Sequence, residues 1–400
     1  MSLFATPEIE DGKITRIFAS AKYPSRQIGN LFFDCDLTPN LKYADEMPLK
    51  LNGFYSLIAF RPSHILLSRD VLGGKPLYYN PVNLAISSFK EFCSNSNEVV
   101  EVSEGEVLKI DYDGSIVQRR VYYFHDVFKR FKMDGSAELV KELMETIEKS
   151  LLNFKPKHSC IAFSGGVDSS LLAAMYDLQL VAVTANEKEK EWIKKAAKEI
   201  GRDLEIFIFD EKDVKGVLPE ITSLIETHDA MQVSIAIPIY FTTRFAKELG
   251  YNRIVFGQGA DELFGGYKRY EMLNEFELEE QLELDVRRIG RNNLIRDNKI
   301  AYGNEIKIET PYLQWDVIKA AINIPPNYKV RRDDGVTIRK YALRKIASKY
   351  LPKEIAHRDK KAVQYSTKTK NLLFRIARRE GKKIKEYLDS LKGDAKDFWF

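Results

Sequence analysis

The residues with the clearest chemical potential form the string Ser-Gly-Gly-Val-Asp-Ser-Ser at positions 164–170. The string follows the apolar stretch 158–163, which is typical of a strand, and we expect a helix from Ser169. Glycines at such a turn let backbone N–H groups approach a phosphate, and the N-terminus of the helix adds partial positive charge. Asp168 would repel a phosphate unless it holds a divalent cation. The string therefore predicts a phosphate-binding loop with Mg²⁺ rather than a plain glycine turn, although its spacing is not that of Gly-x-x-x-x-Gly-Lys.

A second glycine-rich string, Gly-Gln-Gly-Ala-Asp-Glu-Leu-Phe-Gly-Gly-Tyr, occupies positions 257–267 and follows a predicted strand at 253–256. Alone, such a turn with acidic residues is more often structural. Because the carboxyl ends of parallel strands meet at one edge of a sheet, we expect Asp168 and Asp261 to share one Mg²⁺.

Short apolar runs separated by turn residues predict an antiparallel, sandwich-like unit in the first third of the chain. The predicted strands are 54–60, 65–68, 77–79 and 84–87, followed by a hairpin of 107–112 and 115–123 around Asp113-Gly114. An amphipathic helix then begins near residue 137, with apolar residues at 139, 143, 147 and 151. We place the domain boundary at residue 130.

Strands and helices alternate beyond this boundary, which predicts an α/β fold with a parallel sheet. The expected order is strand 158–163, a helix from 169, strand 180–183, helix 187–200 and strand 205–209. After Tyr270 the sequence reads as mostly helical.

Composition restricts the possible locations and partners of the chain. The 400 residues carry a net charge of +4, which neither favours nor excludes a nucleic-acid partner. The uncharged stretch 230–243 is shorter than the roughly 20 apolar residues of a membrane helix. Three cysteines without a C-x-x-C pair, five histidines without zinc-ligand spacing and the lack of a signal-peptide pattern predict a cytoplasmic protein without disulfides or structural zinc.

The string 164–170 resembles the pyrophosphate loop of N-type ATP pyrophosphatases. Together with 257–267, it resembles the synthetase domain of glutamine-hydrolysing asparagine synthetases and their relatives, the β-lactam synthetases. Further similar segments are 226–240, 296–313, 339–344 and 351–355, and in the first domain 69–79 and 86–90. The resemblance implies a degenerate Ntn-type, glutaminase-like sandwich domain at 1–130 and an adenine-nucleotide α-hydrolase-like ATP pyrophosphatase domain at 131–400.

The resemblance also assigns roles to individual residues. It implies that ATP is held by Ser164, Gly165, Gly166, Val167, Asp168, Ser169, Ser170, Val183 and Gly257, and Mg²⁺ by Asp168 and Asp261. Lys360, with Lys361 as the alternative, sits where the family has a lysine that meets the reacting α-phosphate. Gln258 and Asp261 complete the implied catalytic set.

The sequence departs from the family in two places that bear on nitrogen chemistry. The family's glutaminase needs an N-terminal cysteine, whereas residue 2 is Ser2, and the internal Cys35 and Cys93 cannot replace it. Gln258 replaces a family glutamate, and an amide cannot act as a general base. His228 stands where the family has tyrosine. We therefore expect no glutamine hydrolysis, and these departures leave the acceptor open.

The expected function is an ATP- and Mg²⁺-dependent ligase that adenylates a small-molecule carboxylate for attack by ammonia or an amine. The ammonia would be free or supplied by a separate partner protein, and the chain could form a homodimer. Two alternatives remain open: an ATP pyrophosphatase that acts on a nucleobase or a tRNA, and a non-catalytic ATP-binding protein.

Overall fold

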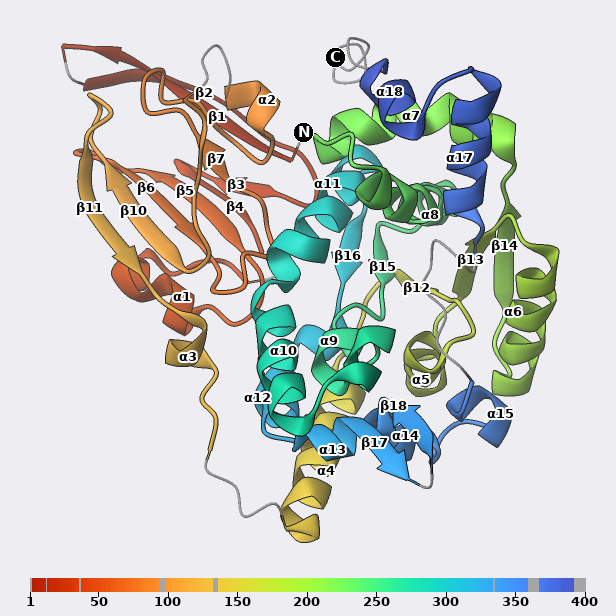
Figure 1. The fold of residues 1–400 in the computed structure, drawn as a ribbon. Helices are drawn as coiled ribbons and strands as arrows, with labels where there is room; N and C mark the ends of the chain where they lie inside the picture. The colour runs from red at the N-terminus through yellow and green to blue at the C-terminus, as the bar shows by residue number, and fades with distance from the viewer. Residues whose placement is uncertain are drawn as a thin grey trace.

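The computed structural model describes residues 2–11, 13–35, 37–93, 98–131, 136–333, 335–358 and 367–391. The chain forms two lobes that lie side by side (Figure 1): an N-terminal lobe of residues 2–131 and a C-terminal lobe of residues 136–391. Among the described residues, no helix is both long and apolar enough to cross a membrane.

The N-terminal lobe is a sandwich of two sheets. One has the order β2-β1-β8-β7-β9 and the other the order β11-β10-β6-β5-β4-β3. Apolar side chains from both sheets, including Leu3, Ile86, Ile58 and Leu108, form one core between them. The elements are β1 (Leu3–Glu10), β2 (Lys13–Ala21), β3 (Arg26–Ile28), β4 (Leu31–Asp34), η1 (Leu41–Glu46), α1 (Met47–Lys50), β5 (Ser56–Phe60), β6 (Ile65–Arg69), β7 (Tyr78–Tyr79), β8 (Ile86–Ser87), α2 (Lys90–Cys93), β9 (Val100–Glu101), β10 (Glu106–Ile110), β11 (Ile116–Val121) and α3 (Phe124–Val127).

The C-terminal lobe is built on a five-stranded sheet of order β14-β13-β12-β15-β16, in which each neighbouring pair is parallel. Side chains alternate between its faces, as a strand requires. Ile161 and Ala182 join the core on one face, whereas Cys160 and Val181 join the core on the other. The strands are β12 (Ser159–Ala162), β13 (Leu180–Thr184), β14 (Leu204–Ile208), β15 (Arg253–Val255) and β16 (Lys307–Glu309).

Helices cover both faces of this sheet, which makes a three-layer α/β/α arrangement (Figure 1). The core of one face includes residues of α4 (Ala137–Asn153), α5 (Val167–Met175), α6 (Glu187–Ile200), α12 (Trp315–Ile322) and α14 (Tyr341–Ala347). The core of the other includes residues of α7 (Glu211–Ile225), α8 (Ala230–Glu248), α17 (Thr369–Arg379) and α18 (Ile384–Asp389).

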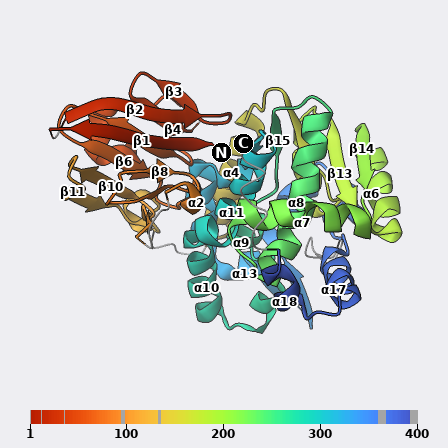
Figure 2. The ribbon, with the colours of Figure 1, turned by 90° about the horizontal axis from the view of Figure 1, so that it is seen from above.

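The remaining elements bring the motif residues together and connect the lobes. They are α9 (Ala260–Phe264), η2 (Lys268–Met272), α10 (Glu275–Arg287), η3 (Gly290–Leu294), α11 (Ile295–Gly303), η4 (Pro311–Leu313), α13 (Pro326–Lys329), the hairpin β17 (Val330–Asp333) and β18 (Val336–Arg339), and α15 (Lys353–Ala356). Helix α11 lies where the two lobes meet (Figures 1 and 2).

The sequence predictions and the structure differ in three details. Residues 3–34 hold four strands, β1 to β4, where no strand was predicted. Helix α5 begins at Val167, two residues before the expected Ser169. The region after Tyr270 contains β16 and the β17–β18 hairpin in addition to helices.

Candidate functional site

The 164–170 string connects β12 to α5 at the carboxyl end of the sheet. Gly165 has a φ of +64°, in the left-handed region that favours glycine. A Cβ at this position would lie 2.7 Å from the indole nitrogen of Trp192, which donates a hydrogen bond of 3.0 Å to the Gly165 carbonyl. Trp192 on α6 therefore fixes the path of the loop.

The serines of the loop occupy different environments. The hydroxyls of Ser164 and Ser169 lie 3.1 Å apart, and the backbone N–H of Ser164 donates to Ser169 Oγ. Ser164 is exposed, whereas Ser170 is completely buried within the first turn of α5. The exposed hydroxyl of Ser164 is thus better placed than that of Ser170 to meet a phosphate.

The second glycine-rich string follows β15, the neighbour of β12 in the sheet. A Cβ on Gly257 would lie 3.1 Å from Asp168 Cβ, so the glycine permits the two strand ends to approach closely. The chain order reverses between β12 and β15, because β13 and β14 lie on one side and β16 on the other. In open α/β sheets such a switch point is where ligands bind.

Asp168 and Asp261 are brought together by a buried lysine. Lys340 Nζ lies 2.5 Å from Asp168 Oδ2 and 2.7 Å from Asp261 Oδ1, and the lysine is fully buried. Lys340 precedes α14 with a φ of +57°, which is uncommon for a residue other than glycine. The predicted proximity of the two carboxylates agrees with this arrangement.

The same carboxylates fit a divalent cation. Two carboxylates that already share one ammonium offer the oxygen ligands that Mg²⁺ takes, and Mg²⁺ usually completes its shell with water and substrate phosphates. Gly266 lets Asp261 and Lys340 pack against its backbone, because a Cβ there would lie 1.9 Å from Asp261 Oδ1 and 2.2 Å from Lys340 Cε.

Glu262, next to Asp261 in sequence, is a buried carboxyl of a different kind. Burial, and then the nearby charge of Asp261, raise its pKa to about 7. Tyr267 donates to Glu262 Oε1 at 2.5 Å, and Asn293 Nδ2 donates to the same oxygen at 2.7 Å. Near neutral pH this carboxyl therefore changes protonation beside the paired aspartates.

Gln258 points to a second buried acid, Asp297 on α11. Its Nε2 donates to Asp297 Oδ2, while Arg296 donates to Asp297 Oδ1 at 2.8 Å through Nε. Asp297 is 1% exposed, and burial raises its pKa. Arg296 also reaches Gln232 on α8, so residues of three similar segments meet in one hydrogen-bonded chain.

The other predicted site residues are placed as follows. Val183 is buried at the end of β13, on the face covered by α7 and α8. Lys360 and Lys361 lie outside the described residues. Arg358, two residues before Lys360, stacks on Trp192 at 4.4 Å and donates to the Ser164 carbonyl at 3.1 Å. The chain leading to Lys360 is thus anchored on the phosphate loop.

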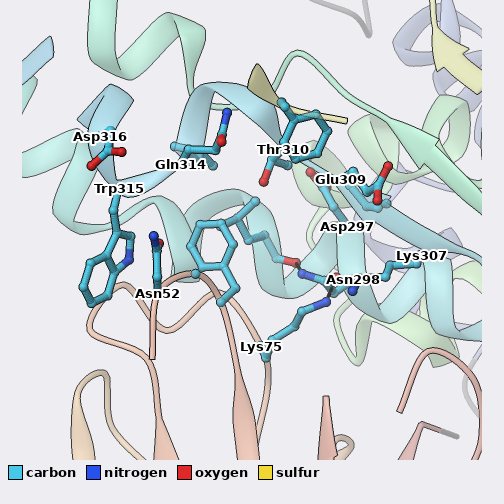
Figure 3. A pocket seen from close by; sticks show the side chains of 16 residues that line it. Asn52, Lys75, Asp297, Asn298, Lys307, Glu309, Thr310, Gln314, Trp315 and Asp316 are labelled. Atoms are coloured by element: carbon cyan, nitrogen blue, oxygen red, sulfur yellow. Dashed lines mark hydrogen bonds between the residues drawn. The ribbon is translucent and has the colours of Figure 1, made fainter. Parts of the chain in front are cut away.

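A cavity of about 190 Å³ lies where the lobes meet (Figure 3). Lys75 and Asn52 reach it from the N-terminal lobe, opposite Asn298 and Trp315 of the C-terminal lobe. Asp297 lines this cavity and also contacts Gln258. The lining residues are Asn52, Gly53, Phe54, Lys75, Phe154, Leu294, Asp297, Asn298, Lys307, Ile308, Glu309, Thr310, Leu313, Gln314, Trp315 and Asp316.

Sequence reasoning missed the roles of Lys340, Asp297 and Trp192. The first two lie in segments 339–344 and 296–298, which were noted as similar to the family but given no function. Charged residues in otherwise apolar or helical segments were the available signal. Trp192 had no such signal, because a tryptophan on an amphipathic helix is most simply a core residue.

The family model described as asparagine synthase matches residues 142–281 and 273–392. A Methanocaldococcus jannaschii protein with the provisional name asparagine synthetase [glutamine-hydrolyzing] 1 is 29% identical over 88% of this chain and 76% of its own length. Asparagine synthetase [glutamine-hydrolyzing] 1 of Lotus japonicus and the root asparagine synthetase of Pisum sativum are each 27% identical. The alignments cover 82% and 84% of this chain but only 60% and 63% of those two relatives.

Among solved structures, an NH3-dependent NAD synthetase from Campylobacter jejuni aligns with 43% of this chain at 14% identity. Its TM-score of 0.23 is too low to bear on the fold. The family model, by contrast, spans more than half of the chain, including both glycine-rich strings and the Lys340 segment. This chain belongs to the asparagine synthase family.

Proposed function

We propose that the chain adenylates a small-molecule carboxylate with ATP and transfers the acyl group to ammonia or an amine. By family it is a carbon–nitrogen ligase that uses ATP. The observation that carries the proposal is the Asp168–Lys340–Asp261 cluster, set between a phosphate-type loop and a neighbouring strand end. Such an arrangement of cations and carboxylates suits the triphosphate of a nucleotide.

The proposed reaction has two steps. A carboxylate oxygen attacks the α-phosphorus, the bond to the β-phosphate oxygen breaks, and pyrophosphate leaves. The amine nitrogen then attacks the acyl carbon, AMP leaves, and the nitrogen loses one proton. Mg²⁺ held by Asp168 and Asp261 would neutralise the leaving pyrophosphate. Lys360, through its resemblance to the family lysine, would stabilise charge on the α-phosphate.

The residues around the loop support distinct parts of this chemistry. The N-terminus of α5, which begins at Val167 directly after the two glycines, would bind pyrophosphate oxygens. Lys340 sets the distance between the two carboxylates before a cation enters. Gln258 offers its Oε1 as a hydrogen-bond acceptor for the incoming amine, because its Nε2 is committed to Asp297.

We further propose that the nitrogen does not come from glutamine hydrolysed by this chain. Ser2 is completely buried, and its hydroxyl is bonded to that of Ser25. Cys93 is also buried, and burial raises its pKa to about 12, which disfavours a thiolate nucleophile. Free ammonia, or ammonia from a separate partner protein, would then be the donor.

The remaining parts of the proposal concern organisation. We propose a degenerate Ntn-type domain at 1–130 and the ligase domain at 131–400, in agreement with the β sandwich that precedes α4. Cys35, Cys93 and Cys160 are buried and form no disulfide, which suits a cytoplasmic location. A homodimer remains part of the proposal.

The experiment is a screen for AMP and pyrophosphate release with ATP, Mg²⁺ and individual amino acids or other carboxylates. Each is assayed with ammonium and, separately, with glutamine. We expect release that needs one carboxylate and yields an amide with ammonium but not with glutamine alone. Asp168→Asn should abolish release, and Asp177→Asn, which alters an exposed aspartate after α5, is the matched control. ADP formation, or glutamate release from glutamine, would contradict the proposal.

A further inference from the structure

Helix α11 carries four consecutive polar residues at the meeting of the lobes, and all four are buried: Arg296, Asp297, Asn298 and Lys299. Burying charged groups is costly unless each is paired. Arg296 and Asp297 contact groups of the C-terminal lobe. Asn298 contacts Lys75 of the N-terminal lobe, and Lys299 contacts both lobes, through Tyr78 and through its ion pair with Glu226.

On the N-terminal side, Lys75 makes the central contact. Its Nζ donates to Asn298 Oδ1 at 2.8 Å and lies 3.3 Å from Asp34 Oδ2 (Figure 3 shows Lys75 reaching Asn298). Asn298 Nδ2 returns a hydrogen bond of 2.9 Å to the Gly74 carbonyl, and Tyr302, one turn further along α11, donates to Asp34. Lys75 belongs to the 69–79 segment, which resembles part of the family's glutaminase domain.

On the ligase side, the residue before Asn298 holds the catalytic candidate. Asp297 accepts from Gln258 on one oxygen and from Arg296 on the other. Because Asp297 Oδ2 accepts from the Nε2 of Gln258, the Oε1 of that amide is left facing away from the carboxyl group. A shift of α11 would carry Asp297 with it, because the side chain is buried and is also held by Arg296 on the same helix, and would thereby release this orientation.

We propose that Lys75 is a positioning residue of the ligase site: through Asn298 it fixes α11 so that Asp297 orients Gln258. The N-terminal lobe then contributes to amide transfer without any chemistry of its own. This inference rests on the proposed function for its kinetic consequences but not for its structural ones.

The test uses the full-length chain and a double-mutant cycle. Lys75→Met combined with Asp34→Asn removes the buried ion pair as a unit and leaves an acceptor for Tyr302. ATP–pyrophosphate exchange reports adenylation, and amide formation with ammonium reports transfer. We expect transfer to fall about 10-fold and exchange to change less than 2-fold. In a Gln258→Ala background, the same pair of substitutions should lower the rate of transfer by less than a further 2-fold. The effects of substitutions at residues that act through one group are not additive.

A merely structural role for Lys75 would give equal losses in both backgrounds, and that result would overturn the inference. The control is Arg130→Gln, which breaks contacts of the connecting segment with Glu279 and Glu283 on α10 and should leave transfer unchanged. Should the double variant fail to fold, Asn298→Ala cuts the same link and keeps the Lys75–Asp34 pair.

Hydrogen exchange provides a readout that needs no activity. The amides of 257–261 should exchange faster in the Lys75 variant than in wild type or Arg130→Gln. Unchanged exchange at 257–261 would refute the link even if no acceptor is found, whereas an inactive wild type with the expected exchange pattern would refute only the proposed function.

Discussion

Replacement of Lys340 by methionine tests the cluster at the centre of the site. The change keeps most of the apolar stem and removes the ammonium that lies 2.5 Å and 2.7 Å from two carboxylate oxygens. Each contact is worth about 6 kcal/mol at an effective dielectric constant of about 20, before desolvation offsets most of it. Removing one member of a buried ion pair costs about 3–5 kcal/mol. At about 2 °C per kcal/mol for a lobe of this size, Tm should fall by about 6–10 °C.

Mg²⁺ should reverse part of this loss in the variant. Without Lys340 the Asp168 and Asp261 carboxylates face each other uncompensated, so a divalent cation gains affinity for them. At 100 times its Kd, Mg²⁺ would restore about 2.7 kcal/mol. Thermal unfolding with and without MgCl2, in the absence of ATP, measures this directly.

The matched control is Lys299→Met, which removes another buried lysine, one paired with Glu226. It should also lower Tm, because it too leaves a carboxylate without its partner, but Mg²⁺ should not restore it. Equal stability of Lys340→Met and wild type would refute the account. So would an equal Mg²⁺ response in wild type, Lys340→Met and Lys299→Met, because the cation would then act elsewhere.

Three further predictions follow from the same region. Gly266→Ala should cut ATP-dependent AMP release more than 10-fold while the protein still folds, because its Cβ displaces Asp261 and Lys340; Gly216→Ala in α7, where a Cβ meets nothing within 4 Å, should keep full activity. The pKa of Glu262 is about 7 in the folded protein against an ordinary 4.5, so the folded state favours the protonated carboxyl. The free energy of unfolding therefore falls by up to about 3 kcal/mol as pH rises from about 4.5 to 7. Glu262→Gln should therefore gain stability over wild type across that range in urea titrations, and a pH-independent difference would contradict it. Gln258→Glu should lower Tm at pH 8, because two carboxylates then meet, and adding Asp297→Asn should restore it; no restoration would argue against their contact.

The glycine-rich turn after β12 and the meeting of Asp168 with Asp261 could be predicted because both depend on local rules. A glycine-rich turn after an apolar run marks a strand end, and neighbouring parallel strands bring such ends to one edge. Lys340 could not be placed in this way. It follows β18, a strand outside the main sheet, and reaches the carboxylates only through the tertiary packing of α14. Asp297 was equally hidden, because a charged residue in a helix usually faces solvent.

The first 34 residues show a different limit. Strand β2 is largely exposed on both faces, so its sequence lacks the alternation from which strands are recognised. Pairing with β1 defines the strand, and that partner precedes it in the chain. The exposed strands of this lobe were thus harder to predict than its buried ones, because an edge strand depends on the neighbour with which it pairs.

The most direct test of the central claim follows oxygen rather than product amounts. A carboxylate identified by the AMP screen is labelled with ¹⁸O in its carboxyl group and incubated with the enzyme, ATP, Mg²⁺ and ammonium. If the chain forms an acyl-adenylate, one labelled oxygen must appear in AMP, and mass spectrometry should find AMP heavier by one ¹⁸O with unlabelled pyrophosphate. Unlabelled AMP, or label in inorganic phosphate together with ADP, would contradict adenylation of the carboxylate.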